Sequence, residues 1–488
     1  MKRLLFLISL IWFSLNGICK EVPLPSITAA ADAFMHKRLH GSFLVKTDTL
    51  FNGQKEPVGY LFRYAPSGFL IISSSADVNP VYAYSIEGNV NLSVDEEKIM
   101  RGTISKDLDC RIKSSVYYTT HSSAAIAKDW SDFLAGTSLI GLSQNNLFQQ
   151  WPSPGSTPTE GWIITNYTQS APYNAMCPLD LNAGSRSIAG CPAIAMAQIL
   201  NYHREINYTR FDSNDDYYHN FGSGNSFWID DDHLEHDFPS FDTLNLWLDT
   251  LEETFSVNGT LSNSEKAALS FACGVAAQQV YSASVSGTFG MEQAAMAFQR
   301  FGFDESRLVY PTDTSLNNLI AENIKKALPV HLGLLSSTGS GGHNVVVDGY
   351  NTDAFYHFNF GWGGSANGWY TLPPQQIPYS LTIIESALLD IKSSIYTSVS
   401  GSNNSDQKVL IYPNPMNDYL VVNGNSGKTT ITIINLQGEV VFSSSFTGPN
   451  TIIQNVKFHP GCYFYRISDE TGNVFSGKLI RVNNSFLP

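Results

Sequence analysis

The 488-residue sequence predicts an α+β protein in which helices come before strands. Three observations support this fold class. In the block from about 160 to 390, helical patterns at 192–202 and 264–280 precede the strand patterns, as in α+β domains. The residues before this block combine a helical pattern at 27–39 with short strands. The final residues, 408–488, contain only short strands separated by turns, which is typical of a small sandwich.

The composition fits several folded domains and excludes some classes of protein. Lys and Arg number 29 and Asp and Glu 43, so the formal net charge is −14, which argues against nucleic acid as a partner. The apolar fraction of 43% and the aromatic fraction of 12% are high enough to exclude a disordered chain. The chain length predicts about three domains.

The start of the chain predicts export. A basic Lys2-Arg3 pair is followed by an apolar run to Leu15, which is typical of a secretory signal peptide and too short to span a membrane comfortably. We assign 1–19 to this peptide. Cys19 leaves open an acylated N-terminus, although the three residues before it fit that motif poorly.

The N-terminal unit is expected to cover 20–145 and to contain no catalytic constellation. A proline-rich stretch at 148–162 excludes a regular helix and marks a boundary, so the central block is assigned to 146–391. N-terminal strands are expected at 60–64, 68–73 and 78–85, and central strands at 329–333, 344–348, 355–359 and 369–371.

The C-terminal unit follows a polar linker of small residues at 392–407. Its apolar and β-branched runs predict strands at 409–412, 419–422, 429–434, 439–442, 463–467 and 478–482.

Cysteine usage indicates that at least one thiol is free. Six cysteines occur, and removal of the signal peptide leaves an odd number, five, which is not a dense disulfide framework. A free thiol in an exported protein is either buried or used in chemistry. Whether Cys177 and Cys273 pair stays open.

Cys191 is the candidate nucleophile. Pro192 suits the first position of a helix, which places Cys191 at the helix N-terminus, where backbone amides favour a thiolate and predict a depressed pKa. Gly190 leaves room for the backbone of a substrate to approach. Taken alone, the cysteine would more often be an inert core residue.

His343 is the candidate base. It follows a glycine run that ends at Gly342 and stands at the head of a predicted strand, so the imidazole is fixed while the rim stays accessible. Asn359 ends the next strand, and its amide is suited to orient the imidazole. His343 lies 152 residues after Cys191 and Asn359 16 residues later. This order fits thiol proteases of the papain group.

Gln169 is the candidate oxyanion donor. Its side-chain amide, together with the backbone amide of Cys191, can stabilise a tetrahedral intermediate.

Four segments together resemble the streptopain family of secreted cysteine proteases. They are the Gln-x-x-Pro-Tyr-Asn segment at 169–174, the Gly-Cys helix at 190–203, the Gly-Gly-His segment at 341–349 and the Asn-x-Gly-Trp-Gly-Gly segment at 359–364. Phe360 replaces the tryptophan that is usual in the family and changes a residue that normally lines the site.

The resemblance implies a papain-like catalytic domain whose activity needs no cofactor or metal. By carry-over, Cys191 is the nucleophile, His343 the base and acid, Gln169 the oxyanion donor and Asn359 the group that orients the histidine. Substrate contacts are expected at Gly190, Gly342, Phe360 and Trp362.

The resemblance also implies partners and a location. The unit at 20–145 looks like an inhibitory propeptide, so the chain would be a zymogen that acts on protein or peptide substrates. The unit at 408–488 looks like a type IX secretion sorting domain, with Tyr-Pro-Asn-Pro at 412–415. It implies contact with the secretion machinery and a secreted or outer-membrane surface location.

Three alternatives remain open at this stage. His233 and His236, in an acidic stretch, would suit a zinc protease that is sensitive to chelators. A surface adhesin or an inactive relative would fit the substitution at Phe360 and would lack a fast-reacting Cys191. Acyl transfer to an amine instead of water would use the same chemistry.

Overall fold

The computed structural model describes most of the chain, and the predicted signal peptide and nearly all of the predicted linker lie outside the described residues. The described residues are 21–115, 120–138, 148–221, 225–312, 315–335, 342–374, 383–392, 410–412, 416, 419–423, 427–435, 438–447, 450–454, 459, 461–469 and 474–481. Within these residues, no helix has the length and apolar character needed to cross a bilayer.

The described residues of the N-terminal region form three helices and a four-stranded meander. Helix α2 begins at a capping box, in which Ser93 and Glu96 satisfy each other's backbone amides. The elements are α1 (Leu24–Arg38), β1 (Phe43–Phe51), β2 (Pro57–Ala65), β3 (Phe69–Ser73), β4 (Val81–Ser85), α2 (Val94–Ser114) and α3 (Thr120–Leu134).

The central block has its larger helices first and its longer strands last, as the sequence predicts. Its helices are α4 (Cys191–His203), α5 (Phe241–Ser256), α6 (Asn263–Ala276), α7 (Met291–Arg300) and α8 (Leu316–Lys325). Its strands are β5 (Gln150–Trp151), β6 (Leu179–Asp180), β7 (Ser185–Arg186), β8 (Tyr218–Asn220), β9 (Ser226–Trp228), β10 (Arg307–Val309), β11 (Val330–Leu335), β12 (Gly342–Asn351), β13 (Phe355–Asn359), β14 (Gly368–Thr371) and β15 (Ile384–Leu389).

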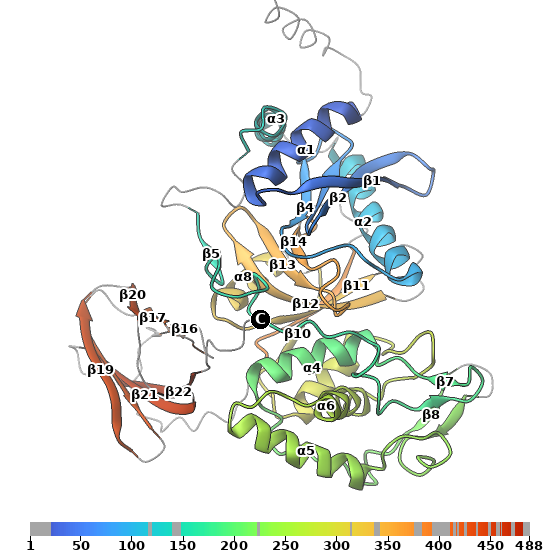
Figure 1. The fold of residues 1–488 in the computed structure, drawn as a ribbon, viewed down its shortest axis with the longest axis vertical. Coiled ribbons are helices and arrows are strands. Elements are labelled where there is room, and N and C mark those ends of the chain that lie inside the picture. Colours follow the sequence, from blue (N-terminus) through green and yellow to red (C-terminus); the bar gives the residue numbers. More distant parts are fainter. Residues whose placement is uncertain are drawn as a thin grey trace, which may run out of the picture.

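One sheet joins the N-terminal region to the central block. The strand order is β1-β2-β3-β4-β14-β13-β12-β11-β15-β10, with β5 paired to β12, and antiparallel pairing of β4 with β14 aligns Tyr84 with Trp369 and Ala83 with Tyr370. Figure 1 shows the blue N-terminal strands running directly into the orange central strands. The predicted boundary at 145/146 lies outside the described residues, and the strands before and after it belong to one sheet.

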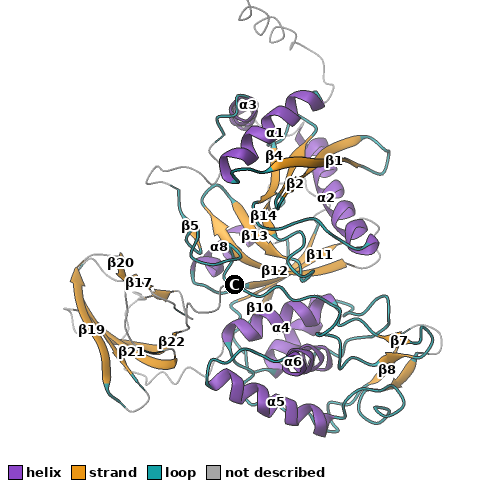
Figure 2. Ribbon diagram, in the orientation of Figure 1, coloured by secondary structure: helices purple, strands orange, loops and turns teal. Residues whose placement is uncertain are grey.

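The sheet has a different core on each face. Val346 of β12 packs into a core with residues of α4, α5 and α6, the helices grouped below the sheet in Figure 2. Its neighbour Val345 packs on the opposite face, in a core that also contains Met100, Ile104 and Leu108 of α2. This alternation follows from the period of two along a strand, and it decides which side chains of β12 face α4.

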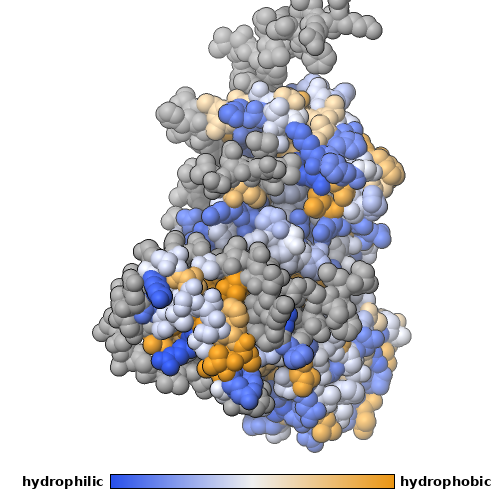
Figure 3. All heavy atoms as spheres, turned by 60° about the vertical axis from the view of Figure 1, so that its left-hand side comes forward, coloured by the Kyte–Doolittle hydropathy of each residue, from blue (hydrophilic) through white to orange (hydrophobic). Residues whose placement is uncertain are grey.

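Where it is described, the C-terminal unit forms two sheets around a core of its own. The first has the order β16-β17-β20 and the second β19-β18-β21-β22. Met416, Leu420 and Val422 meet Ile431, Ile467 and Leu479 in the core between them. The strands are β16 (Leu410–Tyr412), β17 (Tyr419–Asn423), β18 (Lys428–Ile434), β19 (Val440–Thr447), β20 (Asn450–Gln454), β21 (Gly461–Asp469) and β22 (Val474–Arg481). On the face shown in Figure 3, hydrophobic residues form several separate patches among polar ones.

Candidate active site

Cys191 is the first residue of helix α4 and Gly190 is its N-cap, so the helix begins one residue earlier than the sequence predicts. The preceding Gly190 has φ +83°, and a Cβ there would lie 2.7 Å from the side-chain oxygen of Gln279, so glycine is required by both conformation and space. Pro192 stands in the first turn, and every residue from 192 to 200 is buried. The sulfur is therefore mounted on a helix that is fixed within the core.

The sulfur of Cys191 has an unexpected partner, Asn344. The backbone N–H of Asn344 donates to Sγ at 3.4 Å, and its side-chain amide nitrogen lies 3.9 Å from the same atom. Burial raises the pKa of the Cys191 thiol above its ordinary value, while these two hydrogen bonds lower it. The prediction of a depressed pKa is wrong for this form of the chain, because the loss of solvation is the larger effect.

His343 is buried away from Cys191. Its Nε2–H donates to the carbonyl oxygen of Phe360 at 2.8 Å, and its ring stacks on Trp362 with 4.4 Å between centroids. A small cavity of about 30 Å³ beside the imidazole is lined largely by apolar side chains, among them Ile99 and Met100 of α2. Burial lowers the pKa of His343 to about 4, so the ring is neutral.

Strand geometry explains this separation. His343 and Asn344 are neighbours in β12, paired with Leu334 and Gly333 of β11, so their side chains point to opposite faces of the sheet. Asn344 faces α4 and His343 faces the N-terminal region. Among the described residues, no hydrogen bond or ion pair joins Cys191 to His343.

Asn359 is the buried last residue of β13, but its hydrogen-bond partners differ from the one predicted. It exchanges two hydrogen bonds of 3.2 Å with Gln198 of α4, donates to the carbonyl oxygen of Thr165 at 3.0 Å and accepts from the backbone of Gly361 at 3.0 Å. In this conformation Asn359 ties α4 to the sheet, and its role toward His343 stays a prediction.

Gln169 lies in a loop that is attached to the segment just before the nucleophile. Its carbonyl oxygen accepts a hydrogen bond of 2.9 Å from the backbone of Ala189, two residues before Cys191. The side chain is partly exposed. This places the loop next to Cys191, as an oxyanion donor requires, while the donor role stays a prediction.

The residues expected to contact substrate are largely closed off in this conformation. Phe360 and Trp362 are buried and stack on each other with centroids 4.9 Å apart, enclosing His343. A Cβ at Gly342 would come within 2.3 Å of the carbonyl oxygen of Leu334, so this glycine allows β11 and β12 to approach closely.

Three polar residues near the site, Asn344, His331 and Gln198, are not among those predicted from the sequence. Gln198 carried a detectable signal, since it is a polar residue within an otherwise apolar helix and is completely buried. Asn344 and His331 carried none, because their importance depends on the pairing of two strands. His331 Nε2–H donates to Asn344 Oδ1 at 2.7 Å.

The histidines of the acidic stretch make structural contacts. Nδ1 of His233 and of His236 lie 2.8 and 3.1 Å from the carbonyl oxygens of Asp230 and Leu179, and His236 stacks on Phe227. Within the described part of the chain, no group of acidic, histidine and cysteine side chains is arranged to hold a metal ion. Cys177 and Cys273 are both buried and unpaired.

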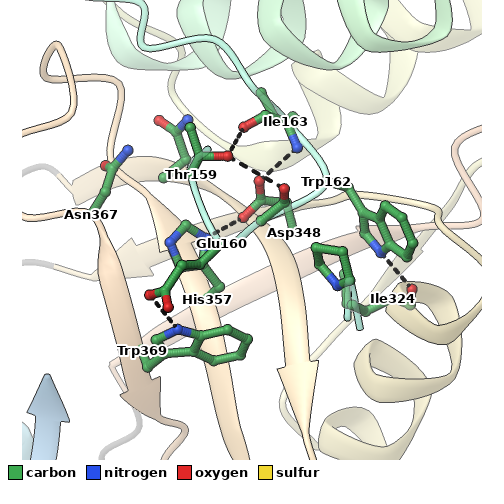
Figure 4. Close-up of polar contacts among 12 residues, drawn as sticks. Thr159, Glu160, Trp162, Ile163, Ile324, Asp348, His357, Asn367 and Trp369 are labelled. Carbon is green, nitrogen blue, oxygen red and sulfur yellow. Dashed lines mark hydrogen bonds and ion pairs between the residues drawn. The ribbon is translucent and has the colours of Figure 1, made fainter. Parts of the chain in front are cut away.

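A second polar cluster lies where the N-terminal region meets the central block. His357 Nδ1 lies 2.7 Å from Asp348, and Glu160 accepts a hydrogen bond of 2.9 Å from the indole of Trp369 (Figure 4). A polar cavity of about 330 Å³ is bordered by Glu160 and His357 on one side and by Glu87 of the N-terminal region on the other. Burial raises the pKa of both Glu160 and Glu87, and the charge of Glu160 adds to the shift at Glu87.

Two family models match parts of the chain. Residues 167–370, which include the helix of Cys191 and the strand of His343, match the peptidase C10 family. The central part of the chain is therefore similar to the peptidases of the C10 family. This is the streptopain family that the four sequence segments indicate. Residues 410–482 match the secretion system C-terminal sorting domain, which marks the chain for secretion or for the cell surface.

Individual curated relatives show the same similarity. Streptopain of Streptococcus pyogenes is 29% identical over 223 residues, which is 42% of this chain and 53% of streptopain. The thiol protease/hemagglutinin PrtT of Porphyromonas gingivalis is 26% identical over 224 residues, 41% of this chain and 22% of that protein. The chain thus spans about half or less of the length of these relatives.

A solved structure similar to this chain is a prointerpain A fragment of Prevotella intermedia. It is 19% identical, with a TM-score of 0.48, and the match covers 72% of this chain and 99% of the fragment.

Proposed function

We propose that the chain is a secreted cysteine endopeptidase made as a zymogen. The observation that carries this proposal is the position of Cys191 at the N-terminus of a buried helix, close to the start of β12. Asn344 of β12 contacts the sulfur of Cys191, and His343 is the residue directly before Asn344. The peptidase C10 match and the thiol protease relatives support the same chemistry.

In the proposed mechanism, the Cys191 thiolate attacks a peptide carbonyl and His343 protonates the leaving amine. Gln169 and the backbone amide of Cys191 stabilise the oxyanion, and water then hydrolyses the acyl-enzyme. Asn359 orients His343 in the active conformation. Gly190, Gly342, Phe360 and Trp362 line the substrate cleft once His343 has moved.

The N-terminal region, 20–145, is the proposed inhibitor. Its helix α2 helps to cover the imidazole, and burial there keeps the pKa of His343 near 4. Once His343 leaves this pocket, its pKa returns toward its ordinary value of 6.5, where the imidazole can exchange a proton with the thiol. Removal of the N-terminal region therefore makes His343 competent as a base.

The test is proteolysis of casein by the matured protein after Cys191→Ala. We expect a loss of at least about 10³-fold, because the nucleophile is removed. Cys177→Ala, which changes a buried thiol of the same block, is the matched control and should retain activity. Unchanged activity in the Cys191 variant would end the proposal.

Inhibitors separate this proposal from a metalloprotease. Iodoacetamide should abolish the activity, and a chelator should leave it intact. Inhibition by the chelator alone would replace the thiol mechanism with a metal-dependent one.

A further inference from the structure

Asn344 occupies the place beside the sulfur that the base of the proposed reaction must take. Its backbone and side-chain nitrogens lie 3.4 and 3.9 Å from Sγ of Cys191, while His343 is bonded to the carbonyl of Phe360. Since the two neighbours point to opposite faces of β12, they cannot both face Cys191 while the start of this strand stays paired with β11.

His331 fixes the orientation of the Asn344 amide. It lies on β11 on the same face of the sheet, is completely buried, and places Nε2 2.7 Å from Asn344 Oδ1. Because this oxygen only accepts hydrogen bonds, Nε2 carries the proton, and the amide nitrogen is left to face the sulfur. Burial lowers the pKa of His331 to about 4, so the ring remains a neutral donor at physiological pH.

The three groups therefore form a directed chain of donors that ends on the sulfur. His331 donates to Asn344, and Asn344 donates to Cys191 from both its backbone and its side chain. Hydrogen bonds in such a chain strengthen one another in a low-dielectric interior. Donors aimed at a sulfur favour its thiolate form over the thiol.

We propose that Asn344, held by His331, positions Cys191 in the latent chain, and that replacement of Asn344 by His343 at the sulfur assembles the catalytic pair. This inference rests on the proposed function and names the regulation of that site. Asn344 and His331 act through the nucleophile and are positioning residues. The exchange requires the first residues of β12 to leave their register with β11.

The test is the pH profile of iodoacetamide labelling of Cys191 in the intact, unprocessed chain, followed by mass spectrometry of the peptide that carries it. Asn344→Ala should lower the acid dissociation constant of the thiol about three- to tenfold, as expected for the loss of one hydrogen bond. His331→Phe should act in the same direction but less strongly, and His331→Gln, which keeps a donor, should restore the parental midpoint.

Two controls separate positioning from a loosened fold. Val346→Ala removes buried volume from the same face of β12 but removes no hydrogen-bond donor, so it should leave the midpoint in place. His343→Ala should also leave the midpoint of the unprocessed chain unchanged, because His343 does not contact Cys191 there. The variants are then converted to the mature form by a trace of parental enzyme, and the effects of the two substitutions on the labelling midpoint should reverse. In the mature form, His343→Ala should shift the midpoint and Asn344→Ala should not.

An Asn344→Ala profile that superimposes on the parental one would overturn the inference. So would a shift from His343→Ala in the unprocessed chain as large as that from Asn344→Ala. Both results come from labelling of the latent chain, so they are distinguishable from a failure of the casein assay, which tests the proposed function itself.

Discussion

The N-terminal region and the C-terminal unit flank the same central block but are attached to it in different ways. The N-terminal region continues the central sheet through β4 and β14 and shares cores with the central strands. The C-terminal unit has two sheets and a core of its own, and none of its described strands pairs with the central sheet. It approaches the central block through an ion pair of 3.3 Å between Lys478 and Glu205.

This difference indicates what each unit can do. Removal of the N-terminal region must break strand pairing and expose a shared core, so it can be coupled to movement of His343. Among the described residues, removal of the C-terminal unit breaks no strand pairing with the central sheet and leaves the central core intact. The N-terminal region is suited to control activity, and the C-terminal unit is suited to direct the protein to its location.

Two matched core substitutions should show the largest effect. Ile71→Ala and Ile431→Ala each remove a completely buried side chain, one from the shared core and one from the C-terminal core, and each should cost about 2–5 kcal/mol. In a Cys191→Ala background, Ile71→Ala should lower the main calorimetric transition, and Ile431→Ala only a separate one. A single transition lowered by both variants would show that the two units unfold together.

Arg111→Lys should weaken the attachment of α2 by about 1–3 kcal/mol. The guanidinium of Arg111 bonds Asp107 at 2.8 Å and donates to the side chain and carbonyl oxygen of Thr371 in β14 at 2.9 and 3.0 Å. Lysine cannot reproduce these hydrogen bonds, because its ammonium group lacks the planar, forked arrangement of donors in a guanidinium. Limited proteolysis within α2 should become faster, whereas the exposed change Lys113→Arg should leave it unaltered.

Glu160→Gln should alter how the stability of the unprocessed chain depends on pH. The pKa of Glu160 is raised by burial, so the folded chain holds its proton more tightly than the unfolded chain. Its contribution is present below the ordinary value of 4.5 and is lost as pH rises through the raised value. The melting temperature of the variant should therefore fall less steeply than that of the parent above pH 4.5, and parallel curves would contradict this.

Lys478→Ala should have the smallest effect. Its partner Glu205 and Lys478 itself are both partly exposed, and such pairs contribute about 0–1 kcal/mol. Both calorimetric transitions should stay where they are in the parent. A loss of more than about 2 kcal/mol would show that the C-terminal unit is coupled to the central block after all.

Much of the fold follows from local patterns, and the exceptions have physical reasons. Helix α4 and strands β2, β3 and β11 to β14 were predicted from apolar spacing, a proline and β-branched runs. Helix α2 was missed because its buried face includes Thr103, Ser105, Asp107 and Arg111, which conceal the apolar period. Strand β20 was missed as well, although it pairs with β17 along its whole length.

The candidate site likewise combines features that local sequence patterns predict with features that only tertiary contacts decide. The sequence by itself determined that Cys191 begins a buried helix and that His343 heads a strand, because caps, glycines and alternation act over a few residues. Only the tertiary structure decided that Asn344 faces the sulfur and His343 the N-terminal region. Which face of a strand meets which helix depends on register with β11 and on packing against α2, more than 200 residues earlier in the chain, and no local pattern contains that information.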